Sequence, residues 1–151
     1  EIPLVAQPVL YNGVIYTLDT DSTVSAFSAS SGKRVWERSV RPKKEGDDVI
    51  GGGLAISGNI LFVTGGYGEL LALDLKEGKK IWKALLSSPS RAAPTVLGDS
   101  VYVLTVDNRL SSFNVADGKL RWEYEGLSEA AGIVGAASPA ANRSALSLSS
   151  L

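Results

Sequence analysis

The amino-acid sequence predicts an all-β fold of repeated four-stranded antiparallel units, and three columns of recurring residues are the observations behind this prediction. The tryptophans of the 151-residue chain stand 46 and 40 residues apart, at Trp36, Trp82 and Trp122. A Gly-Lys pair comes shortly before each of them, beginning at Gly32, Gly78 and Gly118. An aromatic residue recurs at the same two offsets, as Tyr16, Phe62 and Tyr102. A period of about 40 residues is typical of a propeller blade, so we expect a β-propeller.

Each unit contains four short apolar runs separated by turn residues. In the third unit the expected strands are Ala93–Leu97, Ser100–Thr105, Arg109–Val115 and Leu120–Tyr124. Gly, Asp and Asn, which favour hairpin turns, stand at the breaks between them. Both faces of the strands are largely apolar, as expected for a sheet that is covered on both sides. No segment shows a capped helical stripe, so we expect no helix longer than one turn.

The repeats divide the chain into consecutive blades. Three complete blades are expected at about residues 5–40, 52–86 and 92–126, and a fourth starts at about 136–151. Propellers are built from four or more blades. The sequence therefore predicts a partial propeller that belongs to a larger ring.

The Gly-Lys-x-x-Trp ending of each unit predicts how the blades dock. Gly32, Gly78 and Gly118 permit a positive φ in the hairpin before the last strand. The tryptophan on that strand offers a large flat surface to the neighbouring blade, and its N–H needs one acceptor. Burying such an aromatic side chain stabilises a fold by about 3 kcal/mol. We therefore assign these glycines and tryptophans a structural role in docking one blade against the next.

Composition excludes several classes of function. Sixteen acidic and fifteen basic residues leave a net charge of −1, which argues against binding to nucleic acid through an excess of cations. The chain has no Cys and no His, so it lacks the usual thiolate and imidazole nucleophiles, bases and metal ligands. No stretch is typical of a transmembrane helix. We predict no catalytic residue, no metal site and no cofactor.

The repeat endings resemble those of a known superfamily. They read A-F-S-A-S-S-G-K-R-V-W from Ala26, A-L-D-L-K-E-G-K-K-I-W from Ala72 and S-F-N-V-A-D-G-K-L-R-W from Ser112. These segments resemble the pyrroloquinoline-quinone (PQQ)-like propeller repeat, A-x-D-x-x-T-G-K-x-x-W. Only Asp74 keeps the aspartate of that consensus, since Ser28 and Asn114 stand at the equivalent positions.

Within that superfamily the chain is most similar to the BamB family of the outer-membrane β-barrel assembly machine. The resemblance implies an eight-bladed, non-enzymatic propeller on the periplasmic side of the outer membrane, anchored by a lipid outside this sequence. It also implies two kinds of partner. One is BamA, the barrel-forming subunit, and the other is the unfolded outer-membrane protein that BamB helps to deliver.

The connection from Gly126 to Ser138 is the candidate partner site. It is longer than a bare turn, and apolar side chains on such a loop often mark a protein contact. The resemblance implies that its Leu-Arg-Gly element, which contacts BamA, corresponds here to Ile133, Val134 and Gly135, without the arginine. The candidate contact residues are Leu127, Glu129, Ile133, Val134 and Gly135.

Three further segments have a functional and a structural interpretation. Asp19–Thr23 resembles the start of a calcium loop but lacks its Gly and Glu, so a polar hairpin turn is expected. Gly51–Gly53 and Gly65–Gly68 lack the residues of a phosphate loop, so close backbone approach and a turn are expected. Arg41–Asp48 is either a solvated loop or a loop that contacts a partner.

Three functions remain open from the sequence. The first is a scaffold that holds partners, and the second is a PQQ-dependent dehydrogenase, which shares this repeat. The third is a sensor or recognition propeller of the same superfamily. The expected inner strands offer only Gln7 and Thr95 as polar ligands, which favours the scaffold.

Overall fold

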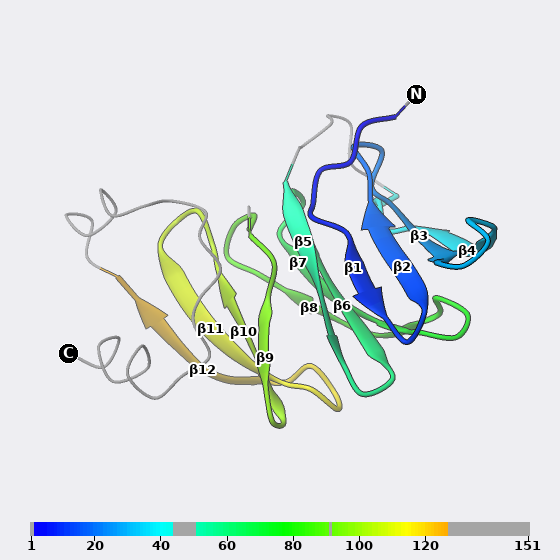
Figure 1. Cartoon of the computed structure of the whole chain (residues 1–151). Coiled ribbons are helices and arrows are strands. Elements are labelled where there is room, and N and C mark those ends of the chain that lie inside the picture. The colour runs from blue at the N-terminus through cyan, green and yellow to red at the C-terminus, as the bar shows by residue number, and fades with distance from the viewer. Residues whose placement is uncertain (1, 44–50, 91, 127–151) are drawn as a thin grey trace.

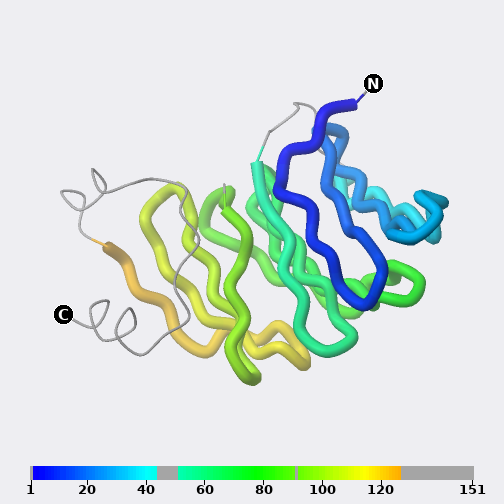
Figure 2. Tube along the Cα trace, in the orientation of Figure 1, coloured from blue at the N-terminus to red at the C-terminus, as the bar shows by residue number. Residues whose placement is uncertain are grey.

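The computed structural model describes residues 2–43, 51–90 and 92–126 of the chain. Within these ranges the chain forms β-strands and turns but no helix. The strands make three four-stranded antiparallel sheets, and in each sheet consecutive strands are neighbours. Figure 1 shows the sheets side by side in chain order, and the tube of Figure 2 follows the same path. Since the described residues hold only strands and turns, they contain no helix able to cross a membrane.

Each sheet is one blade with short hairpin connections. The first blade consists of β1 (Val9–Tyr11), β2 (Val14–Leu18), β3 (Thr23–Ser28) and β4 (Arg34–Ser39). The second consists of β5 (Gly52–Ser57), β6 (Ile60–Gly65), β7 (Glu69–Asp74) and β8 (Lys80–Leu85). The third consists of β9 (Thr95–Leu97), β10 (Ser100–Leu104), β11 (Arg109–Asn114) and β12 (Leu120–Glu125).

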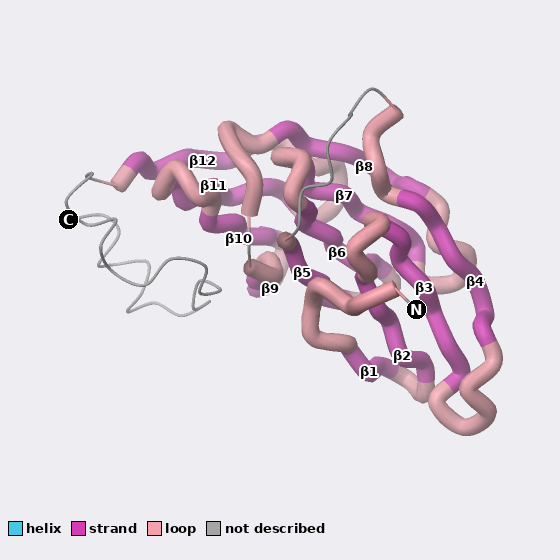
Figure 3. The backbone as a smooth tube through the Cα atoms, turned by 90° about the horizontal axis from the view of Figure 1, so that it is seen from above, coloured by secondary structure: helices cyan, strands magenta, loops and turns pink. Residues whose placement is uncertain are grey.

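The blades fan out as in a propeller. In Figure 3 the first strands, β1, β5 and β9, lie toward one side, and the last strands, β4, β8 and β12, lie along the opposite rim. The prediction of four-stranded antiparallel propeller blades is therefore confirmed. The third blade departs slightly from expectation, because β9 begins at Thr95 rather than at Ala93. Pro94 stands directly before it and has no N–H to donate to a strand ladder.

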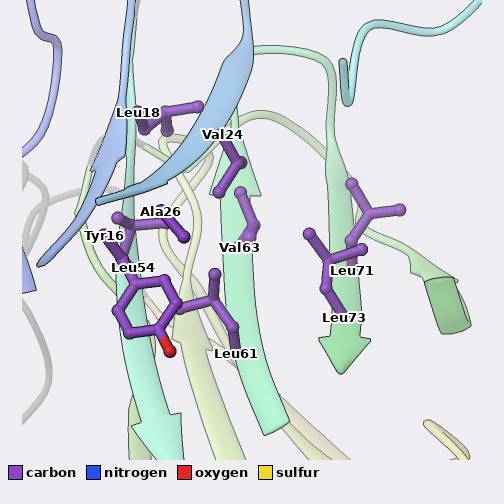
Figure 4. Close-up of a cluster of buried hydrophobic side chains, with 9 residues drawn as sticks. All are labelled: Tyr16, Leu18, Val24, Ala26, Leu54, Leu61, Val63, Leu71 and Leu73. Carbon is purple, nitrogen blue, oxygen red and sulfur yellow. The ribbon is translucent and has the colours of Figure 1, made fainter. Parts of the chain in front are cut away.

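The hydrophobic core lies between neighbouring blades. The cluster in Figure 4 joins side chains of the first blade, Tyr16, Leu18, Val24 and Ala26, to side chains of the second, Leu54, Leu61, Val63, Leu71 and Leu73. A second cluster joins the second blade to the third. Because successive side chains of a strand point to opposite faces, β6 gives Leu61 and Val63 to the first cluster and Phe62 to the second. The apolar character of both strand faces thus follows from the stacking of blades.

A tryptophan on the last strand of one blade bonds to the next blade. Trp36 Nε1 donates to the carbonyl of Leu75 at 2.9 Å, and Trp82 Nε1 donates to the carbonyl of Val115 at 2.9 Å. Each acceptor stands in the hairpin that leads to the last strand of the neighbouring blade. Trp36 and Trp82 thus each contact the neighbouring blade, and the acceptor of each N–H is identified.

All three hairpin glycines have a positive φ, and two of them also contact a tryptophan ring. The predicted positive φ is confirmed, with 72° at Gly32, 73° at Gly78 and 75° at Gly118. The second reason for glycine, at Gly78 and Gly118, is contact with the tryptophan of the preceding blade. A Cβ atom at Gly78 would lie 2.5 Å from Trp36 Cε3, and one at Gly118 would lie 2.6 Å from Trp82 Cδ2. No side chain fits at either position unless the indole ring moves.

At each end of the described blades, only one residue of the tryptophan–glycine contact is among the described residues: Gly32 at one end and Trp122 at the other. A Cβ atom at Gly32 would meet nothing within 4 Å. Trp122 is 39% exposed, and among the described residues its indole N–H meets no acceptor. The docking role of Gly32 and Trp122 therefore stays a prediction, as does the larger ring that would supply their partners.

Replacement of Gly118 and of Gly32 by alanine should lower the free energy of unfolding by different amounts, because only Gly118 contacts a ring. Gly118→Ala should lower the free energy of unfolding by about 2–4 kcal/mol, because the methyl displaces Trp82 in addition to straining the backbone. Gly32→Ala is the matched control, since its φ is the same but its surroundings are open; its cost should be about 1–2 kcal/mol. Urea unfolding followed by tryptophan fluorescence measures both. Equal losses would show that the ring contact adds nothing.

Candidate functional site

The predicted partner-contact residues follow the last described strand. Leu127, Glu129, Ile133, Val134 and Gly135 all lie outside the described residues, as does the expected fourth-blade start at 136–151. Most of the Arg41–Asp48 loop also lies outside them. The structure does fix where the candidate connection begins. The amide of Gly126 donates to the carbonyl of Asn108 at 2.9 Å, so the chain leaves β12 beside the turn between β10 and β11.

A groove runs along the first strands of the blades, on the side where a propeller has its central channel. It has a volume of about 570 Å³ and is lined mainly by small and apolar residues, among them Val5, Ala6, Pro8 and Leu54. Gln7 is its only polar side chain among the described residues, and Thr95, the other predicted polar residue, is not part of the lining. The described residues also contain no group of three His, Cys, Asp or Glu side chains able to hold a metal ion.

Dehydrogenases that share this repeat bind a quinone and calcium, and such a site needs ligands that this groove would have to supply. Calcium takes six to eight oxygen ligands, several of them carboxylates. Among the described residues the groove presents one amide side chain and otherwise apolar side chains and backbone. The residues described here therefore do not fit a calcium–quinone site, and no chemical step is assigned to them.

The glycine segment that opens the second blade serves backbone packing. A Cβ atom at Gly53 would overlap the backbone of Ala93 in the third blade, and one at Gly52 would overlap the carbonyl of Thr64. Nearby, Thr64 Oγ1 donates to the carbonyl of Ala92 at 2.8 Å. Close backbone approach, to the neighbouring strand at Gly52 and to the third blade at Gly53, is thus the structural role of these positions.

The aspartate segment of the first blade forms the expected hairpin turn between β2 and β3. Asp19 Oδ1 accepts the amides of Asp21 at 3.0 Å and Thr23 at 2.9 Å. The amide of Ser22 donates to the Asp19 carbonyl at 3.1 Å, and Ser22 has a φ of 60°. The Asp19 side chain therefore bonds to its own turn.

A polar cluster at the junction of the second and third blades was not predicted from the sequence. Ser87 Oγ and Ser88 Oγ donate to Asp107 Oδ1 at 3.1 and 2.7 Å. The hydroxyl of Thr105 donates to the same oxygen, and Arg109 Nε lies 3.6 Å from Asp107 Oδ2. The cluster thus joins the segment after β8 to the turn after β10.

These neighbours set the pKa of the Asp107 carboxyl. Burial alone would raise it, but the hydrogen bonds from Thr105, Ser88 and Ser87, with the charge of Arg109, outweigh burial and lower the pKa. The repeat did not reveal the cluster, because the matching positions of the first two units hold Asp21 and Tyr67 and show no recurring pattern. Its partners are close only after two blades have stacked.

Comparison with known proteins places this geometry in a family. A family model described as "Outer membrane protein assembly factor BamB" matches residues 20–150. The chain belongs to this family. The resemblance of the Gly-Lys-x-x-Trp repeats to PQQ-like and BamB propellers is therefore confirmed at the level of the family.

Individual members of the wider group have different names. An uncharacterised protein of Rickettsia conorii is 36% identical over 126 residues, which cover 83% of this chain and 30% of the relative. The quinohemoprotein alcohol dehydrogenase ADH IIB of Pseudomonas putida is 31% identical over 137 residues, 80% of this chain and 20% of the relative. BamB of Shewanella oneidensis is 29% identical over 125 residues, which cover 78% of this chain and 32% of the relative. The chain thus spans about a third or less of the curated relatives it matches.

Solved structures share the fold. BamB from Moraxella catarrhalis superposes with a TM-score of 0.67 at 17% identity, over 81% of this chain and 37% of that one. The quinohemoprotein alcohol dehydrogenase from Comamonas testosteroni gives a TM-score of 0.71 at 22% identity, over 83% of this chain and 21% of that one. These likenesses confirm that the three sheets have the fold of propeller blades.

The polar cluster predicts how stability changes with pH. Because the pKa of Asp107 is lower in the folded chain than in the unfolded one, its ionised form stabilises the fold above about pH 4. This contribution is lost as the pH falls through the folded pKa. Asp107→Asn should therefore show a smaller fall in Tm between pH 6 and pH 3 than the wild type, measured by circular dichroism. An unchanged pH profile would contradict the cluster's role.

Proposed function

We propose that this chain is part of a non-enzymatic binding propeller of outer-membrane β-barrel assembly. In this proposal it contacts a BamA-like barrel-assembly subunit and assists the delivery of unfolded outer-membrane proteins. It would work on the periplasmic side of the outer membrane, held there by a lipid anchor outside this sequence. Its role would be to hold protein partners on a rigid array of blades.

One observation carries this proposal. The family model that covers residues 20–150 is described by the name of an outer-membrane protein assembly factor. The Shewanella oneidensis protein of that name is a relative over 78% of this chain. Blades that repeat their docking contacts suit this role, because a rigid scaffold can present loops to partners.

The surroundings of the first strands support a role without chemistry. General acid–base and metal-assisted catalysis need titratable or metal-ligating side chains beside the substrate. The groove along those strands has Gln7 as its one polar side chain among the described residues. The proposal accordingly places function on loops and rims.

The candidate contact with the assembly subunit is the connection after β12. Its apolar residues, Ile133 and Val134, would fill an apolar pocket on the partner, and Leu127 would extend the same surface. Because Gly126 is bonded to the turn after β10, the connection starts at a fixed place on the third blade. In this proposal the contact is mainly apolar, since Val134 stands where the family has arginine.

A dehydrogenase is the second candidate, and one observation favours it. The Pseudomonas putida quinohemoprotein alcohol dehydrogenase is 31% identical over 80% of this chain, close to the identity with BamB. Addition of PQQ and calcium to the protein, followed by dye-linked oxidation of alcohols and sugars, tests this alternative. Turnover above a PQQ-free control would overturn the scaffold proposal.

Substitution of the connection tests the proposed contact. Ile133→Asp/Val134→Asp should reduce retention of the protein by an immobilised periplasmic part of BamA about tenfold or more, because two charges would be buried against an apolar pocket. Leu85→Asp/Leu97→Asp is the matched control, since these apolar residues are 75% and 48% exposed and lie away from the β10–β11 turn, and it should bind normally. Circular dichroism checks that both variants fold.

Two results would count against this contact. Equal retention of the wild type and Ile133→Asp/Val134→Asp would exclude the connection as the contact. Failure of the wild type itself to bind would remove BamA as the partner and favour the recognition-propeller alternative.

A further inference from the structure

A basic groove lies between the first two blades at the rim. It has a volume of about 600 Å³ and runs between the segment that leaves β4 and the outer strand β8. Its floor is apolar and includes Val40, Leu71 and Leu73. Six cationic side chains surround this floor: Arg38, Arg41, Lys43, Lys79, Lys80 and Lys83. Glu69 is the single acidic residue among the described residues of the lining.

Few of these charges are neutralised by the described residues. Lys83 Nζ lies 3.3 Å from Glu69 Oε1, and Lys79 Nζ lies 2.8 Å from Glu77 Oε2 at the edge of the groove. Arg38 bonds to backbone instead, donating from Nε to the Gly78 carbonyl at 3.1 Å. Within the described ranges no carboxylate forms an ion pair with Lys80 or Lys43. Among the described residues, the lining of the groove therefore holds six cationic side chains and one acidic one, in a chain whose net charge is −1.

The next blade junction shows that the blade fold does not require these charges. The two repeat offsets place Ala84, Ser87 and Pro89 at the positions of Arg38, Arg41 and Lys43. Of the three lysines, only Lys79 has a basic equivalent, at Lys119. Leu120 and Glu123 replace the other two. Since both junctions form the same tryptophan contact, docking accounts for neither the number nor the sign of the charges.

We propose that this groove binds an acidic, extended peptide segment of a partner protein. Carboxylates of the segment would meet the cations on both walls, and the aliphatic parts between them would lie against the half-buried side chain of Val40. One wall is formed by the end of β4 and the segment that follows it as far as Lys43, and the other by β8 and the hairpin before it. This inference does not depend on the proposed contact with the assembly subunit, which lies after the third blade.

A discrete peptide fits the surrounding charges better than a broad anionic surface does. Two carboxylates are close in sequence to groove cations, Glu37 directly before Arg38 and Glu77 two residues before Lys79, and both side chains are more than half exposed. A membrane or a nucleic acid spreads its negative charge over a wide area and would meet these carboxylates as well. A single strand of peptide can place its acids in the groove alone.

Fluorescence polarisation with a labelled peptide tests this proposal. The probe is a peptide of about ten residues with Glu alternating with Ser, and the reference probe has Gln in place of every Glu. The wild-type chain should bind the Glu peptide at least about tenfold more tightly than the Gln peptide, and the affinity should fall with added salt because the cations are exposed.

Two variants with the same change in net charge locate the site. Lys43→Gln/Lys80→Gln/Lys83→Gln removes three groove cations and should weaken binding of the Glu peptide about tenfold. Lys33→Gln/Lys76→Gln/Lys119→Gln removes three lysines outside the groove lining and should weaken binding less than about twofold. An equal loss in both variants would overturn the proposal, since it would show attraction by overall charge.

A second measurement keeps the test independent of variant folding. Carbodiimide coupling of the Glu peptide to the wild-type chain, mapped by mass spectrometry, should label Lys79, Lys80 and Lys83 in preference to Lys33 and Lys119. Labelling spread evenly over all lysines would contradict the groove. Tighter binding of anionic phosphatidylglycerol vesicles or of a single-stranded oligonucleotide than of the Glu peptide would also overturn it, in favour of a lipid or nucleic-acid ligand.

Discussion

The contact between a tryptophan of one blade and the hairpin glycine of the next is the interaction on which this structure depends. It combines a hydrogen bond from the indole N–H to a carbonyl with a flat ring that covers a residue lacking a side chain. The bond satisfies the one polar group of a large apolar side chain. Because the contact recurs at each described junction, the blades stack with the same geometry and enclose a core between them.

The repeat made this much of the fold predictable, because its spacing follows the mechanics of blade docking. The strand order, the positive φ of Gly78 and Gly118, and the need of Trp36 and Trp82 for an acceptor all follow from local patterns. The second reason for each glycine could not be predicted in the same way. It depends on a ring brought over Gly78 or Gly118 by a different blade, and a repeat in sequence does not say which residues of neighbouring units meet.

Function is expected where the repeat is broken, and sequence patterns reveal this less well. Lysines far apart in the sequence, such as Lys43 and Lys83, are each expected to be solvated charges. They line one groove only when the first two blades stack. Asp107 similarly finds Ser88 only across a junction. These departures from the repeat give one blade junction charged and polar side chains that the other junction lacks.

A double-mutant cycle at Trp82 and Gly118 tests most directly whether ring and glycine form one unit. In the wild-type background, Gly118→Ala should cost more free energy of unfolding than the open-site variant Gly32→Ala, by about 1–2 kcal/mol. In the Trp82→Ala background that excess should vanish, because the methyl group no longer meets a ring. An excess that persists without the ring would contradict the claim that this contact joins the blades.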